Sequence, residues 1–334
     1  MSYQFNWPVF GHREQLKFLQ NAVSENKLAN TYLFYGPAGL GKKFVARYFV
    51  QSIYCQDEKI RPCQKCRACQ AITKGIYPDV YELGKNKQEL SIDNVRELLH
   101  SLALSPVHGA HRVALIYGID QINLYGANAL LKTLEEPGRD TSIIMIGDSL
   151  AGLPATVMSR SQLLKFKPLN NHDMRDWVAS YNFLHEEQDT IINLSFGKPG
   201  LALTMIADKL VNFKKSCNFI IKLLAHGTFY YMQTIDKWFG ILKKEHPEYK
   251  VFELGALTKR YLDLLEVFLR DILWIKLERP VVNQMYQSEL ELLAEQFDKD
   301  RLVRGLLSLE DIKNKLRHNV SPQLLWENLF LSLK

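Results

Sequence analysis

Residues 36–42 have the types and spacing needed to bind phosphate, because they read Gly-x-x-x-x-Gly-Lys. A short apolar run, residues 31–35, precedes them and a helical pattern follows, which is the strand–loop–helix setting of a phosphate-binding loop. Backbone N–H groups, the helix N-terminus and the lysine ammonium would together attract an anion. The candidate phosphate-binding residues are Gly36, Gly39, Gly41 and Lys42.

The parts of such a site that hold and use a metal ion are missing. Lys43 stands where a Ser or Thr hydroxyl would bind Mg²⁺, and an ammonium group cannot ligate a cation. The strand expected at residues 112–117 should end in Asp-Glu to organise Mg²⁺ and water, but it ends in Tyr117-Gly118. The next acid, Asp120, comes two or three residues too late, and we expect it to be a helix N-cap. Binding of ATP or ADP is therefore expected to be weak or absent.

Four cysteines form a second candidate site. Two consecutive Cys-x-x-Cys steps with one further cysteine upstream supply the four thiolates of a structural zinc site, in which no coordination position stays open for chemistry. The alternative is a loop with free thiols. Nearby basic residues, Lys59, Arg61, Lys65 and Arg67, would offset the negative charge of the centre. The candidate ligands are Cys55, Cys63, Cys66 and Cys69, whereas the fifth cysteine, Cys217, is remote.

Composition limits the class of protein. The chain has 334 residues, of which 47% are hydrophobic and 23% charged, and its net charge is +6. This length predicts two or three domains, and the charge is compatible with nucleic acid nearby without requiring it. The sequence contains no apolar run of membrane-spanning length, and its start lacks a signal-peptide pattern. We therefore expect a cytoplasmic protein that does not contact membranes.

Strand and helix patterns alternate in the first half of the chain. This alternation, with a phosphate loop after an early strand, predicts a doubly wound α/β domain over residues 1–168 with the cysteine module inserted at 55–69. Expected strands are 31–35, 79–83, 112–117, 142–146 and 163–166, and expected helices are 10–29, 42–54, 92–104, 126–136 and 153–159.

The second half of the chain is helical. Two or three short helices are expected over a lid domain at 169–208, and an all-α domain over 209–334. Its aromatic residues recur at helical spacing and are expected to form core rather than a base-stacking surface. The long helices are predicted at 211–226, 228–244, 253–278, 286–296, 301–317 and 321–333.

Several stretches together resemble one family. They are 33–43, the cysteine module, Tyr77-Pro-Asp79, the ten residues from Asn128 to Pro137, Ser159-Arg-Ser161 and the C-terminal stretch 319–333. On these stretches the chain resembles the delta-prime family of bacterial DNA polymerase III clamp-loader subunits, within the AAA+ ATPases. The resemblance covers nearly the whole chain.

The resemblance implies an AAA+ domain with a parallel sheet, a small helical lid and an all-α collar. It also implies a hetero-pentameric ring with gamma/tau and delta subunits, which places the sliding clamp onto primer–template DNA. The family carries Ser-Arg-Cys at 159–161, and its arginine reaches a neighbour's ATP site; Arg160 is thereby the implied arginine finger. The arginine by which the motor subunit's lid contacts the nucleotide is absent, since Gly200 occupies its place. The implied subunit is non-motor, without ATPase activity of its own.

Two alternatives remain open at this point. The chain could be an active ATPase of the gamma/tau type that uses Asp120, Glu135 or Glu136 in place of the missing acids. It could instead be a zinc-dependent DNA-binding protein, given the basic residues around the cysteines. The role of Tyr77, where the family has His, is not assigned by the sequence.

Overall fold

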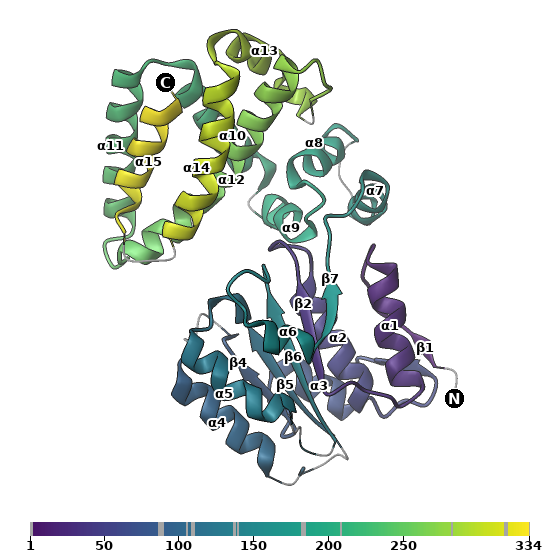
Figure 1. The fold of residues 1–334 in the computed structure, drawn as a ribbon. Helices are drawn as coiled ribbons and strands as arrows, with labels where there is room; N and C mark the ends of the chain where they lie inside the picture. Colours follow the sequence, from purple (N-terminus) through teal and green to yellow (C-terminus); the bar gives the residue numbers. More distant parts are fainter. Residues whose placement is uncertain are drawn as a thin grey trace. The chain divides into compact units, whose positions relative to one another are not determined.

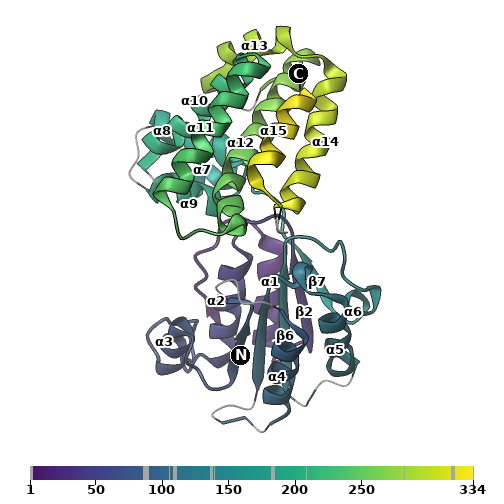
Figure 2. The same cartoon turned by 90° about the vertical axis from the view of Figure 1, so that its left-hand side faces the viewer.

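The computed structural model describes residues 3–85, 90–104, 106–107, 111–135, 138, 140–181, 185–207, 209–281, 283–316 and 320–333. Glu136, Pro137 and Asn319, which figured in the sequence argument, lie outside these ranges. The chain divides into two compact units, drawn in Figures 1 and 2. Unit 1 contains residues 1–183 and 195–202, and unit 2 contains residues 184–194 and 203–334. The division into domains at 168 and 208 stays a prediction.

Unit 1 contains a five-stranded parallel sheet, as predicted. Its strand order is β4–β5–β6–β2–β7, so the strand before the phosphate loop lies between two strands that come much later in the chain. The strands are β4 (Val80–Leu83), β5 (Arg112–Tyr117), β6 (Thr141–Gly147), β2 (Thr31–Tyr35) and β7 (Gln162–Lys165). Every residue of β5 and β6 is buried, and both sequences are apolar after Arg112 and Thr141-Ser142 at their amino ends.

Helices cover both faces of this sheet (Figure 1). One face packs against α1 (Arg13–Ser24) and α2 (Lys42–Tyr54) through residues such as Leu19 and Phe49. The other face packs against α4 (Ile92–Ala103), α5 (Leu124–Glu135) and α6 (Ala155–Ser159). After β5, the short 3₁₀ helix η2 (Ile119–Gln121) leads into α5.

The cysteine segment forms a small annex that the sequence patterns did not predict in detail. It contains β3 (Ile60–Arg61) and α3 (Arg67–Lys74). β3 pairs in parallel with β1 (Gln4–Phe5), so the N-terminal residues attach to this annex.

Three short helices follow the sheet: α7 (Asn171–Ala179), α8 (His185–Ser195) and α9 (Pro199–Ala207). α7 belongs to unit 1, while residues of α8 and α9 are divided between the two units. Within unit 1, the backbone N–H of Leu169 donates to the Gly197 carbonyl at 2.8 Å, which fixes the start of α9 near the end of the sheet.

Unit 2 is helical throughout its described part. α12 is its longest helix and packs against α10, α13, α14 and α15. The aromatic side chains of Phe239, Phe268 and Trp326 are buried, as predicted for core residues, whereas Phe229 is exposed. The helices are α10 (Lys209–Ala225), α11 (Thr228–Glu245), α12 (Val251–Lys276), η3 (Gln284–Tyr286), α13 (Gln287–Gln296), α14 (Lys299–Lys315) and α15 (Pro322–Leu333).

Among the described residues, no helix is both long enough and apolar enough to span a membrane.

Candidate functional site

The phosphate loop has the predicted strand–loop–helix geometry. It leaves β2 at Tyr35 and enters α2 at Lys42. Gly36, Gly39 and Gly41 have positive φ angles of 137°, 84° and 83°, a region that side chains other than glycine rarely adopt. At Gly36 there is also no space for a side chain, because a Cβ would lie 2.1 Å from the Phe166 carbonyl oxygen.

The ammonium group of Lys42 is fully engaged within the chain. It donates to the carbonyl oxygens of Gly36 and Pro37, the latter at 2.8 Å, and to Asp148 Oδ1 at 3.1 Å. An ammonium has three N–H donors, so these acceptors account for all of them. The side chain is 6% exposed. Burial lowers the pKa of Lys42, and the nearby Asp148 carboxylate only partly offsets this effect.

Asp148 is a site residue that the sequence argument missed. It directly follows β6, and Gly147 pairs with Tyr35, so the end of β6 lies beside the start of the phosphate loop. The Asp148 backbone N–H donates to Asp120 Oδ1 at 3.0 Å. The prediction that Asp120 is a helix N-cap is wrong, because Gly118 caps η2 and Asp120 lies inside it. Its carboxylate instead supports the residue that pairs with Lys42.

The two residues that replace the expected metal ligands contact each other. The Lys43 ammonium lies over the ring of Tyr117, 5.1 Å from its centroid, which is a cation–π distance. Tyr117 is buried, and this burial raises the pKa of its hydroxyl. A protein cation and an aromatic ring therefore take the positions from which a hydroxyl and a carboxylate would hold Mg²⁺.

Gly200 packs directly on the loop. Its backbone N–H donates to the Gly39 carbonyl at 2.8 Å, and a Cβ at this position would lie 2.9 Å from Gly39 Cα. A side chain at residue 200 would therefore press on the loop backbone. The absence of an arginine here is part of how this segment and the loop fit together.

Arg160 lies near the amino ends of the strands, whereas the phosphate loop lies at their carboxyl ends. This arginine ends α6 and precedes β7, whose first residue, Gln162, pairs with Tyr32 near the amino end of β2. The loop begins at Gly36, past the carboxyl end of β2, which is about 13 Å further along at ~3.3 Å per residue. The Arg160 side chain is 36% exposed and contacts Glu135 at 2.8 Å and the Thr156 carbonyl at 3.1 Å.

Tyr77 forms part of a structural corner. Its ring lies 4.7 Å from the ring of Tyr54, and the Tyr54 hydroxyl donates to the His111 carbonyl oxygen at 2.7 Å, with the Asp79 carbonyl oxygen 3.1 Å away. The Asp79 carboxylate is fully buried and accepts from the Val107 N–H at 2.7 Å. The Tyr-Pro-Asp stretch thus fastens the start of β4 to neighbouring segments.

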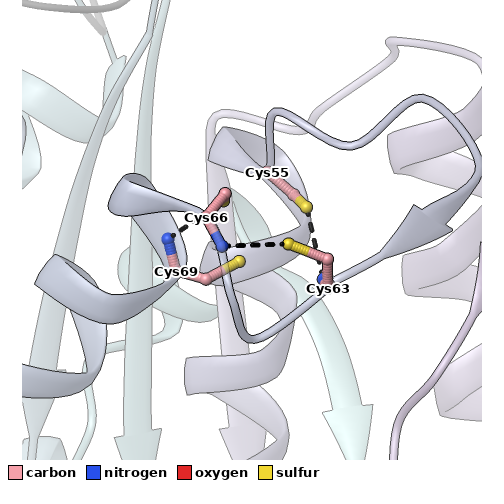
Figure 3. A group of neighbouring side chains, drawn as sticks. All are labelled: Cys55, Cys63, Cys66 and Cys69. Atoms are coloured by element: carbon pink, nitrogen blue, oxygen red, sulfur yellow. Dashed lines mark hydrogen bonds between the residues drawn. The ribbon is translucent and has the colours of Figure 1, made fainter.

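The four predicted cysteines come together, and all of their sulfur atoms lie within 4.8 Å of one another (Figure 3). Four sulfurs at 2.3 Å from a shared Zn²⁺ would be about 3.8 Å apart, so the cluster needs only small adjustments to close on a metal ion. Cys55 and Cys69 are buried, and Cys63 and Cys66 are partly exposed. This donor set fits a four-coordinate metal site.

Backbone N–H groups already point at the sulfurs, as they do around bound thiolates. Cys63 N–H donates to Cys55 Sγ and Cys66 N–H to Cys63 Sγ, both at 3.3 Å. Burial raises the pKa of the Cys66 thiol, but backbone N–H groups of Gln56 and Cys69 outweigh it and lower the pKa to about 7. Burial raises the pKa of Cys55 and of Cys69. Arg61, one of the basic residues near the cysteines, also contacts an aromatic ring, since its guanidinium lies 4.0 Å from the ring centroid of Tyr3.

The family model and the known proteins to which the chain is similar are described as subunits of DNA polymerase III. Residues 11–170 match the family model described as DNA polymerase III, delta subunit. The chain is 26% identical to DNA polymerase III subunit delta' of Bacillus subtilis over 96% of this chain and 95% of that protein. It is also 32% identical to the tau subunit of Bacillus subtilis, over 51% of this chain and 32% of that protein.

A solved structure supports the fold. A DNA polymerase III, gamma subunit-related protein from Thermotoga maritima superposes with a TM-score of 0.51 at 18% identity, covering 95% of this chain and 97% of that one. The α/β fold with a phosphate loop and the helical C-terminal region is therefore confirmed. The chain is thus similar to delta-prime subunits of bacterial DNA polymerase III, and to one of them along nearly its whole length.

Proposed function

We propose that this protein is a non-motor subunit of a bacterial clamp loader and supplies Arg160 to the ATP site of a neighbouring subunit. The observation that carries the proposal is the contrast between two cations. All three Lys42 donors are used by the chain's own oxygens, whereas Arg160 is exposed and keeps donors for a further partner.

The chain's own loop is poorly suited to hydrolysis. In-line phosphoryl transfer needs a positioned metal ion and a positioned nucleophile. Lys43 and Tyr117 contact each other where the metal ligands would be, and Gly200 contacts the loop where a lid arginine would stand. We therefore propose that ATP or ADP binds here weakly or not at all, and that the chain has no ATPase activity of its own.

The position of Arg160 supports action in trans rather than in cis. Because β7 pairs with β2, Arg160 lies near the amino ends of these strands. The phosphate loop of the same chain lies at the carboxyl end of β2, beyond the reach of the Arg160 side chain. An arginine supplied by a neighbour stabilises the charge that develops on the transferred phosphoryl group. Ser161, in place of the family's cysteine, leaves this arginine intact.

The proposed assembly is a hetero-pentameric ring with gamma/tau and delta subunits, in the cytoplasm. The ring would load the sliding clamp onto primer–template DNA during replication. The similarity to delta-prime and tau proteins of Bacillus subtilis supports these partners. Contact of this chain with the clamp and the DNA would be made through the complex.

We also propose that the cysteine cluster holds one structural zinc ion. The thiolates of Cys55, Cys63, Cys66 and Cys69 would complete its coordination, so the metal would organise the annex and take no part in chemistry. Because β3 lies between the first two cysteines and pairs with β1, the same metal would also secure the N-terminal residues.

The alternative, an active ATPase of the gamma/tau type, has less support. Asp120 accepts from the Asp148 N–H, and Glu135 pairs with Arg160 at the end of α5. The Asp120 carboxylate thus supports the residue that pairs with Lys42, and Glu135 lies with Arg160, away from the phosphate loop. Turnover of Mg·ATP by the purified chain, abolished by Lys42→Ala, would favour the alternative.

The central test replaces Arg160 by Ala in the reconstituted loader. We expect DNA-stimulated ATP turnover at the neighbouring site to fall by about 10³-fold, the effect of losing a trans arginine. Lys17→Ala is the matched control, because it removes an exposed cation of the same unit, on α1, and should leave turnover within about twofold. An unchanged rate in Arg160→Ala would reject the proposed role.

The zinc proposal is tested by elemental analysis of the purified chain. We expect about one zinc ion per chain and its loss in Cys66→Ser, together with a fall of at least about 5 °C in Tm. Cys217→Ala is the control, because Cys217 is buried in unit 2 and should not affect zinc content. Equal zinc content in both variants would contradict the site.

A further inference from the structure

We propose that Glu135 is a positioning residue for Arg160, and that its carboxylate holds the guanidinium in the direction needed to reach a neighbour. The inference rests on the proposed function, because Arg160 needs positioning only if it acts on another subunit's nucleotide. Glu135 enters this role through its contact with Arg160 and not through the substitute catalytic role considered from the sequence.

The guanidinium is fixed at two of its nitrogen atoms. Nη2 contacts Glu135 Oε1 at 2.8 Å, and Nη1 donates to the Thr156 carbonyl at 3.1 Å. Because the N–H groups of a guanidinium lie in its plane, contacts at two different nitrogens restrict both its direction and the tilt of its plane. A guanidinium has five N–H donors, so these two contacts leave three that can still reach a phosphate. The contact with Glu135 can therefore persist while Arg160 works.

The backbone on both sides of the contact is held by the core. Leu134, next to Glu135, is 5% exposed, and Val157, three residues before Arg160, is 1% exposed. Both belong to the hydrophobic cluster on the α4–α6 face of the sheet, where α5 packs against α6. The two side chains thus start from fixed points, so one carboxylate contact is sufficient to orient the arginine.

Glu135 is also unfavourable for its own helix. It lies in the last turn of α5 that the structure describes, where the partial negative charge near a helix C-terminus disfavours a carboxylate. Arg160 offsets this repulsion, and it also satisfies a carbonyl in the last turn of α6 through Thr156. The glutamate is therefore better explained by its contact with Arg160 than by helix formation.

Removal of the carboxylate should leave the fold intact, because Glu135 is 51% exposed and exposed ion pairs contribute little to stability. This makes a functional test possible. Glu135→Ala and Glu135→Gln are introduced into the full chain, which is reconstituted with the other loader subunits, and DNA-stimulated ATP turnover is measured over a range of ATP concentrations. Glu97→Ala, at an exposed glutamate on α4, is the matched control.

We expect Glu135→Ala to lower kcat about tenfold with KM within about twofold, because the arginine acts on the transition state. Glu135→Gln keeps an acceptor oxygen and should recover part of this loss. In the Arg160→Ala background, Glu135→Ala should cause no further decrease, since its effect passes through the arginine. Glu97→Ala should match the wild type.

Four outcomes overturn the inference. If Arg160→Ala lowers turnover and Glu135→Ala does not, Glu135 has no positioning role while the proposed function stands. If Glu135→Ala raises kcat, the carboxylate restrains the arginine instead of positioning it. If Arg160→Ala itself has no effect, the proposed function fails and the inference fails with it. A loss of thermal stability in Glu135→Ala that accounts for the lost activity also counts against the inference.

Discussion

The phosphate loop and the end of α6 each carry a cation, Lys42 and Arg160, but the two differ in burial and in how many of their donors are already used. Lys42 is buried and its three donors are used by two carbonyls and Asp148. Arg160 is partly exposed and two contacts leave it with donors to spare. A motif match identifies the residue type in both places, whereas the count of donors already in use distinguishes a structural cation from one available to a ligand.

The largest effect that would sharpen this comparison is on stability. Lys42→Met removes the partner of a carboxylate and of two carbonyls, and we expect the free energy of unfolding of unit 1 to fall by about 2 kcal/mol, reduced from a fully buried pair because Asp148 is 37% exposed. Arg160→Ala should change it by less than about 0.5 kcal/mol. Thermal unfolding of the two variants, side by side, measures the difference. Equal losses would mean that Lys42 is no more structural than Arg160.

A single substitution should give Lys42 the free donor that Arg160 already has. Asp148→Ala should release one Lys42 donor and remove the charge that competes with an anion. We expect pyrophosphate to bind about tenfold more tightly to this variant than to the wild type, measured by calorimetry without Mg²⁺. Asp140→Ala, at another carboxylate of unit 1, serves as control. No gain in affinity would show that the loop is closed for reasons other than Asp148.

The smallest effect concerns pH. His12 Nε2 lies 3.2 Å from the Leu40 carbonyl and its ring lies against Phe166, and burial lowers its pKa below 6.5, with Asp173 and Lys42 as its charged neighbours. The folded state therefore keeps His12 neutral, while the unfolded chain takes up a proton as the pH falls through 6.5. The contribution of His12 to the free energy of unfolding is therefore fully present above pH 6.5 and is lost as the pH falls below that value.

We expect His12→Asn, which tolerates the left-handed backbone at this position, to reduce the loss of Tm between pH 7.5 and pH 5.5. His111, whose pKa is also lowered by burial, should account for part of the remaining slope. An identical pH dependence in wild type and His12→Asn would remove His12 from the explanation.

Most of the regular structure was predictable because it depends on local pattern. The strands at 31–35 and 112–117 and the helix at 42–54 have the predicted bounds. β1 and β3 were missed, since each is two residues long and exists only through pairing between distant segments. No local periodicity can indicate such a strand.

The candidate sites divide in the same way. The cysteines and the loop glycines are recognisable from spacing, and the structure brings each set together. Asp148 and Glu135 were missed as partners because their roles depend on neighbours across the sheet and between helices. An acid directly after a buried strand was the available signal for Asp148, but its meaning requires knowing that β6 lies beside β2. Sheet order is the information that the sequence pattern lacked.

The contact between Gly200 and Gly39 has an evolutionary consequence. An arginine at position 200 would place a Cβ 2.9 Å from the loop backbone, so the mutation would disturb the loop before it could serve a nucleotide. Lys43 and Tyr117 would have to change as well, and each supports the other. None of these substitutions alone would therefore be expected to produce ATP hydrolysis. In the proposed non-motor subunit, packing thus opposes the gain of hydrolysis by single substitutions.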